Sequence, residues 1–100
     1  NSRSSGSDGM KVRFFATYRD ITHVGEMEMP APESVRGLLL LLSECYGPEF
    51  GEKVLSPDRN ALGRDAIVLV DGRHISHLQG IDTPLSESSA VAIFPLVAGG

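Results

Sequence analysis

Apolar and polar residues alternate in the first part of the chain. In residues 11–17, Val12, Phe14 and Ala16 fall on one face, and in residues 23–29, Met27 and Met29 lie opposite Glu26 and Glu28. A period of two is typical of half-buried strands. Residues 18–22 are polar and predict a turn, so the two segments form an antiparallel hairpin. Proline at positions 30 and 32 ends its second strand, because proline cannot donate to the ladder.

The spacing of apolar residues then changes to that of a helix. Val35, Leu38, Leu39 and Leu42 recur at three- and four-residue intervals, Ser34 is placed to cap the first turn, and Gly47-Pro48 ends the pattern. The resulting apolar stripe is expected to cover a sheet. A short helical patch follows at residues 52–55, and residues 56–60 have the composition of a loop.

The second half of the chain predicts strands again. Residues 66–70 form a continuous apolar run that indicates a central strand buried on both faces. Asp71-Gly72 is a preferred type I′ turn pair, so residues 73–75 are expected to return as a short strand before a turn-rich connection at residues 79–85. Residues 90–95 predict the last strand, beyond which the chain leaves the sheet.

The order of these elements defines the expected fold. A hairpin, a helix, a strand, a short strand and a final strand predict an α+β roll in which one helix crosses one face of a mixed sheet. The chain of 100 residues is long enough for one core only. Residues 10–100 are therefore expected to form one domain. Residues 1–9 are rich in Ser and Gly and are expected to be a disordered leader from expression.

Composition narrows the classes of function. The formal net charge of -4 leaves little basic surface for a phosphate backbone, so protein partners are favoured over nucleic acid. The longest apolar run, residues 38–42, is far shorter than the roughly 20 residues of a membrane span. The single cysteine cannot form an internal disulfide, which agrees with a reducing compartment, so we expect a cytoplasmic protein.

Three groups of side chains are candidates for chemistry of their own. His74 and His77 are three residues apart, but no Cys, Asp or Glu accompanies them at ligand spacing, so we expect surface histidines and no metal site. Cys45 is expected to pack in the core as a small hydrophobe. Ser86, Ser88 and Ser89 lack the surroundings of a nucleophile and predict a turn.

The end of the sequence carries the strongest candidate. An apolar segment, Phe94-Pro95-Leu96-Val97, leads from the last strand to Ala98 and then Gly99-Gly100. Glycine lacks a Cβ, so such a tail can enter a narrow channel and leave its terminal carbonyl open to attack. A frayed terminus is the usual alternative for last residues, but it does not explain the strand that precedes the glycines.

Together these features resemble the MoaD/ThiS sulfur-carrier family, a ubiquitin-like β-grasp family that includes the molybdopterin synthase small subunit and the thiamine-pathway carrier. The resemblance spans residues 10–100. It lies in Phe15-Ala16 and Arg19, in the helix at residues 35–42, in the strand and turn at residues 67–72, and in residues 91–100. The chain has Ser88-Ser89 where the family often has Gly-Asp, and Pro95-Leu96 where Pro-Pro is common. Phe15-Ala16 and the segment around Asn60 favour the molybdopterin branch.

The resemblance implies a function and partners. An activating adenylyltransferase of the MoeB/ThiF type would use Mg-ATP to adenylate the Gly100 carboxylate, and a sulfur donor protein would supply the sulfur of a thiocarboxylate. Leu96, Val97, Ala98 and Gly99 would enter the partner's active site. The apolar character of residues 94–97 favours docking by Phe94 and Pro95, and the alternative is that Phe94 belongs to the core and Leu96 packs back on the sheet. The carrier is not catalytic alone and would be the small subunit of molybdopterin synthase beside a MoaE-type large subunit. A ubiquitin-like modifier joined through Gly100, and a carrier for thiamine or another sulfur-containing metabolite, are the alternatives.

Overall fold

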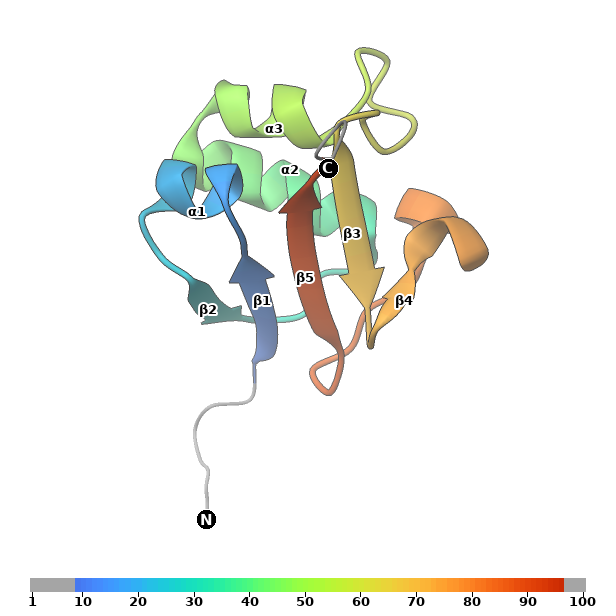
Figure 1. Cartoon of the computed structure of the whole chain (residues 1–100). Helices are drawn as coiled ribbons and strands as arrows, with labels where there is room; N and C mark the ends of the chain where they lie inside the picture. Colours follow the sequence, from blue (N-terminus) through green and yellow to red (C-terminus); the bar gives the residue numbers. More distant parts are fainter. Residues whose placement is uncertain (1–8, 97–100) are drawn as a thin grey trace.

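The computed structural model of the protein describes residues 9–96. Within this range the chain forms a five-stranded sheet of order β2-β1-β5-β3-β4 (Figure 1). The strands are β1 (Met10–Phe14), β2 (Glu26–Met29), β3 (Ala66–Val70), β4 (Arg73–His74) and β5 (Ala90–Pro95). β5 pairs in parallel with β1 and antiparallel with β3, so the last strand of the chain is the middle of a mixed sheet.

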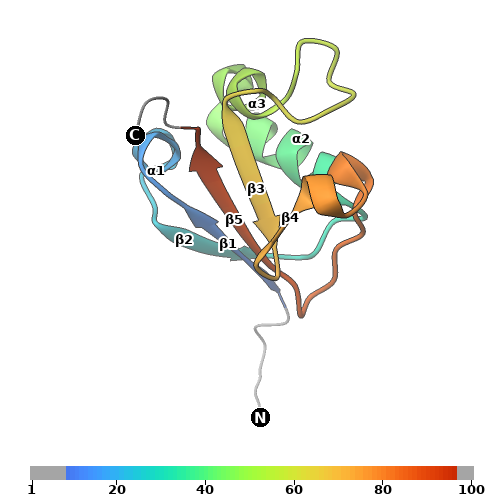
Figure 2. The same cartoon turned by 45° about the vertical axis from the view of Figure 1, so that its right-hand side comes forward.

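Helices cover one face of this sheet. α2 (Val35–Tyr46) and α3 (Pro48–Val54) lie on the same side, as Figure 2 shows. α2 buries its predicted apolar stripe against the sheet, where every second residue of a strand is buried on the same face. Helix and sheet thereby share one core. The predicted α+β roll is therefore confirmed. The largest fully buried side chains are Phe14, Phe50, Met10, Leu38, Leu39, Leu42, Ile75 and Ile93, together with Val12, Val35, Val54 and Val68.

The segment predicted as a turn after the first strand is instead a helix. β1 ends at Phe14, and α1 (Thr17–Thr22) follows, with Tyr18 and Thr22 buried. Ala16 does not continue the strand: it is exposed, with a φ of 51° in the left-handed region. The polar composition of residues 18–22 does not predict this helix. Its stability comes from a tertiary contact, the packing of Tyr18 against Phe50 with ring centroids 5.6 Å apart.

Two expectations about the helices were also wrong in detail. Ser34 occupies the N-cap position, but its side chain makes no capping hydrogen bond. Instead the Val35 N–H donates to the carbonyl of Thr83 at 3.1 Å, so a main-chain contact satisfies one N–H group of the first turn. The patch predicted at residues 52–55 belongs to α3, which begins four residues earlier with Pro48 in the first turn, a position that proline favours.

In the second half of the chain, the position of β3 in the sheet and the length of β4 differ from prediction. β3 is an interior strand but not the central one, and its residues alternate between buried and half-buried, so only one of its faces is fully covered. Asp71 and Gly72 have φ values of 56° and 85°, as the predicted type I′ turn requires. The strand that follows is only Arg73–His74, because Ile75 starts the 3₁₀ turn η1 (Ile75–His77).

Candidate functional site

The central strand carries the chain to one end of the sheet. Pro95 pairs with Ala66, and the N–H of Leu96 donates to the Asp65 carbonyl at 2.9 Å, one residue beyond β5. We call Pro95 and Leu96 the tail root. The main chain of Leu96 is thus held to the sheet, while its side chain is 51% exposed. α1 and α3 lie at this same end (Figure 1).

The residues predicted to carry the chemistry come after the tail root. Val97, Ala98, Gly99 and Gly100 lie outside the described residues. Of the predicted leader, residues 1–9, the structure describes only Gly9. Of the segment predicted to enter a partner's active site, the structure therefore describes Leu96 alone, and of the predicted docking residues it describes both Phe94 and Pro95, each half-buried.

An apolar surface lies beside the tail root on the face of the sheet that α2 does not cover. The rings of Phe15 and Phe94 stack there, with centroids 4.3 Å apart and an interplanar angle of 8°. Phe94 pairs with Ile67, and Ala92 pairs with Leu69, which places these four side chains on one face. We call Phe15, Ile67, Leu69, Ala92 and Phe94 the open-face patch. Phe15 is 36% exposed and the other four are half-buried.

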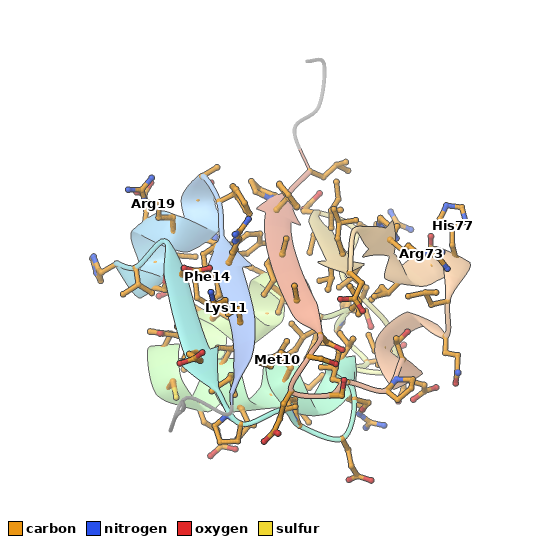
Figure 3. All side chains as sticks on the ribbon, turned by 90° about the horizontal axis from the view of Figure 1, so that it is seen from below. Met10, Lys11, Phe14, Arg19, Arg73 and His77 are labelled. Atoms are coloured by element: carbon orange, nitrogen blue, oxygen red, sulfur yellow. The ribbon has the colours of Figure 1, made fainter. Side chains whose placement is uncertain are left out.

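Charged side chains border the open-face patch along β1. Lys11 and Arg13 alternate with buried residues and so share a face with Phe15. Arg13 forms an ion pair with Glu26 of β2 at 3.2 Å, with both side chains well exposed. Figure 3 shows Arg19 and Arg73 at opposite sides of the sheet. The patch is thus an apolar area with a polar border, which is the usual anatomy of a protein interface.

On its other side the tail root lines a groove of about 720 Å³. Thr17 and Tyr18 of α1 form part of its wall, and Lys53, Arg64 and Asp65 line it from α3 and the following loop. We call this the root groove. Basic and acidic side chains are both present, so its lining has no single sign of charge. The tail root consequently separates an apolar surface from a mixed polar groove.

Tyr18 is the titratable group that this environment perturbs most. The side chain is 2% exposed, and its hydroxyl lies 3.3 Å from the Lys53 carbonyl oxygen and 3.4 Å from that of Asp65. Burial, with a smaller contribution from the Asp65 carboxylate, raises the pKa of Tyr18 to about 12. The neutral hydroxyl has one hydrogen, which it shares between these two carbonyl oxygens.

The other residues singled out from the sequence lie away from the tail root. Cys45 is exposed, so the expectation that it packs in the core was wrong. The reason is that it faces outward from α2, whose buried positions are taken by Val35, Leu38, Leu39 and Leu42. Ser86 and Ser89 form the predicted turn, the Ser86 N–H donating to the Ser89 hydroxyl at 3.2 Å.

The two histidines pack against each other near β4. Their ring centroids are 6.4 Å apart, and Nδ1 of His74 accepts a hydrogen bond from the Ser76 N–H at 3.0 Å. Within residues 9–96, no group of three or more His, Cys, Asp and Glu side chains is placed to hold a metal ion. No helix in this range is long and apolar enough to span a membrane.

The structure adds residues that the sequence alone did not assign to the site. Ile67 and Leu69 belong to a strand that the sequence predicts to be buried on both faces, yet they are half-buried members of the open-face patch. The sequence singles out Phe15 only through the family resemblance, and it places Tyr18 in a predicted turn. The pairing of β1 with β5, which lie about 80 residues apart in the chain, is what joins Phe15 to Phe94.

A β-grasp sheet whose middle strand ends in an exposed tail root defines the ubiquitin-like class of proteins, and the comparisons agree. Residues 12–100 match the ThiS family. A protein of Archaeoglobus fulgidus designated a sulfur carrier is 34% identical over 92 residues, which cover 91% of this chain and 98% of that protein.

Solved structures of related proteins have the same fold. Small archaeal modifier protein 1 from Methanosarcina acetivorans has a TM-score of 0.79 and 29% identity, over 92% of this chain and 96% of that one. The Pyrococcus furiosus protein designated molybdopterin converting factor, subunit 1, has a TM-score of 0.70 and 28% identity, over 89% and 98%. The chain belongs to the ThiS family of ubiquitin-like sulfur carriers and modifiers.

Proposed function

We propose that the protein is a sulfur carrier whose reacting group is the carboxylate of Gly100. The observation that carries this proposal is the family match, which runs from β1 through the tail root to Gly100 itself. The exposed side chain of Leu96 supports it, because a segment that enters a partner must be accessible where the described chain ends.

The chemistry needs activation, because a carboxylate is a poor electrophile. In the first step a Gly100 carboxylate oxygen attacks the α-phosphorus of Mg-ATP bound to a MoeB/ThiF-type adenylyltransferase, and pyrophosphate leaves. In the second step sulfur at the sulfide level attacks the acyl carbon, the C–O bond to AMP breaks, a C–S bond forms, and AMP leaves. The product is the Gly100 thiocarboxylate. A persulfide on a sulfur donor protein reaches the same product once a thiol reduces its S–S bond.

The residues of this chain act by positioning rather than by acid or base catalysis. Gly99 and Gly100 lack a Cβ, so the acyl carbon stays accessible in a narrow channel. Val97 and Ala98, with Leu96, are assigned to the segment that enters the partner. Phe94 and Pro95 are assigned to docking, and the open-face patch extends that surface.

Molybdopterin synthesis is the receiving pathway that we favour. The Phe15-Ala16 start and the segment around Asn60 resemble that branch, and the Pyrococcus furiosus relative bears a molybdopterin designation. In this role a MoaE-type large subunit holds the acceptor. Conjugation of Gly100 to other proteins is the second candidate, favoured by the likeness to an archaeal modifier protein. Delivery of sulfur to thiamine or another metabolite is the third.

The product distinguishes these functions. The full chain is incubated with ATP, magnesium, sulfide and an activating enzyme of this family, and the intact mass is measured. We expect a gain of about 16 Da, as one oxygen is replaced by sulfur, and its loss when Gly100 is deleted. A variant lacking residues 1–8, at the other end of the chain, is the matched control and should gain the same mass.

Other outcomes are equally clear. Branched conjugates of Gly100 with lysine residues, formed in place of the thiocarboxylate, would establish the modifier. If neither product nor an acyl-adenylate forms with an activating enzyme that thiocarboxylates its own carrier, the proposal is wrong and an interaction domain is the better description.

A further inference from the structure

One carbonyl oxygen connects the tail root to α1. The Asp65 carbonyl accepts the Leu96 N–H at 2.9 Å and lies 3.4 Å from the Tyr18 hydroxyl. Asp65 directly precedes β3 and lies opposite Leu96, the residue that follows β5. Tyr18 and Leu96 are thus joined through a single acceptor, although 78 positions separate them in the sequence. The Tyr18 hydroxyl also lies 3.3 Å from the Lys53 carbonyl, so it links α3 to the same point.

The Tyr18 ring is held independently of its hydroxyl. The ring packs against Phe50 in a T-shaped arrangement with centroids 5.6 Å apart. The Tyr18 N–H donates to the Phe15 carbonyl at 3.1 Å, and the Phe15 N–H in turn donates to the Ile93 carbonyl of β5 at 3.2 Å. Since ring and main chain have their own partners, the hydroxyl can be removed while the core contacts remain.

We propose that Tyr18 is a positioning residue for the tail. Its hydroxyl fixes the Asp65 carbonyl in the orientation that accepts the Leu96 N–H, and so sets where the chain leaves the sheet. The functional effect of this tether rests on the proposed function. If the tail must enter a partner's channel, fixing the main chain at Leu96 makes that entry more frequent. Tyr18 touches no reacting atom and does not take part in the chemical steps.

The fixed exit matters because of the geometry around the tail root. Leu96 lies between the open-face patch and the root groove, so a loosened main chain there can turn toward either side. A partner docked on the open-face patch needs the tail on its own side. Ordering a loosened segment at the moment of binding costs entropy, which lowers affinity without changing the chemical step.

The test compares Tyr18→Phe with Tyr46→Phe in the free protein. Tyr46 is the matched control, because its ring also packs against Phe50 but its hydroxyl contacts the Met27 sulfur at 3.4 Å, away from the tail root. Amide hydrogen exchange is measured for Leu96 and for Asp71, whose N–H donates to the Ala90 carbonyl at the opposite end of β5. We expect exchange at Leu96 to rise about fivefold in Tyr18→Phe, the effect of one ordinary hydrogen bond, with Asp71 unchanged.

The outcomes separate positioning from general destabilisation. Equal increases at Leu96 and Asp71, or the same increase in Tyr46→Phe, mean that the hydroxyl only stabilises the fold and overturn the proposal. Unchanged exchange at Leu96 in Tyr18→Phe also overturns it. If Tyr18→Phe does not fold, the wild-type chain still provides a test, because a Leu96 amide that exchanges at the rate of an unstructured peptide contradicts the tether.

A kinetic measurement then links the tether to function. In the thiocarboxylation assay, Tyr18→Phe should raise KM for the carrier severalfold and leave kcat unchanged, because binding is affected and the chemistry is not. An unchanged KM together with faster exchange at Leu96 would show a tether without functional effect and reject the positioning role. The exchange measurement needs no activating enzyme, so failure of the proposed function is distinguishable from failure of this inference.

Discussion

At the scale of single residues, buried polar atoms show which contacts the fold depends on. Within residues 9–96, every buried side-chain nitrogen or oxygen has a hydrogen-bond partner. Tyr18 is an example. Its aromatic ring supplies apolar contact area, and its hydroxyl lies within hydrogen-bond distance of two main-chain carbonyls. Because burial, and to a smaller extent the Asp65 carboxylate, raises the pKa of this hydroxyl, Tyr18 makes the stability of the domain depend on pH.

We predict that the domain loses stability in alkali through Tyr18. The folded pKa, about 12, lies above the ordinary value of 10.0, so between these values the unfolded chain binds fewer protons than the folded one. The free energy of unfolding should therefore be unaffected by this group below about pH 10 and should fall as pH rises from about 10 to 12. Denaturant titrations of wild type and Tyr18→Phe across this range check it.

The variant isolates this effect from other titrating groups. Tyr46, whose pKa is also raised by burial, remains in both proteins and contributes equally. The wild type should lose its advantage over Tyr18→Phe as pH rises. A constant difference between the two across the range would contradict the prediction.

At the scale of elements, the spacing of apolar residues was sufficient to predict a helix or strand wherever the pattern extended over the whole segment. The apolar stripe of α2 was predicted with its buried face correct and β5 with its bounds correct, because each element buries one side along its full length. α1 was missed because its six residues form fewer than two turns, and tertiary contacts of Tyr18 decide its conformation. The turn at Asp71-Gly72 was correct, because only a few residue types favour positive φ at both positions.

We predict opposite effects for the same glycine substitution in two elements. Gly72 has a φ of 85°, and a Cβ added there would meet nothing within 4 Å, so Gly72→Ala costs about 1 to 2 kcal/mol from backbone strain alone. Gly37 is helical in α2, and a Cβ there would meet Pro32 Cβ at 3.4 Å, an ordinary contact. Gly37→Ala should stabilise the protein by about 0.5 to 1 kcal/mol.

Denaturant unfolding of both variants measures the two changes. Each variant serves as the control for the other, since the chemical change is identical and only the backbone conformation differs. Shifts of the same sign would show that backbone conformation does not decide the effect.

At the scale of the whole molecule, the two faces of the sheet have different uses. Helices and the core occupy one face, and the other carries the open-face patch next to the tail root. The sequence identified Phe94, Pro95 and Leu96, because they directly precede the glycines. It did not identify the rest of the patch, because Phe15, Ile67 and Leu69 join Phe94 only through strand pairing between distant segments.

We predict that this face, and not the helical one, binds the activating enzyme. Leu96 and Leu41 are both exposed, at 51% and 42%, but Leu41 lies on α2. Leu96→Glu should weaken binding at least about tenfold by placing a charge in a desolvated contact, whereas Leu41→Glu should leave affinity unchanged. Calorimetric titration of an activating enzyme of this family with each variant measures the difference.

Phe15→Ala separates docking from insertion of the tail. Phe15 belongs to the open-face patch but precedes α1, so its loss removes the stack with Phe94 and leaves residues 96–100 intact. An interfacial aromatic truncated to alanine typically costs about 2 kcal/mol, so affinity should fall roughly thirtyfold if the patch docks. Unchanged affinity in Phe15→Ala with weakened binding in Leu96→Glu would confine recognition to the tail, and equal affinities for Leu96→Glu and Leu41→Glu would remove this end of the molecule from the interface.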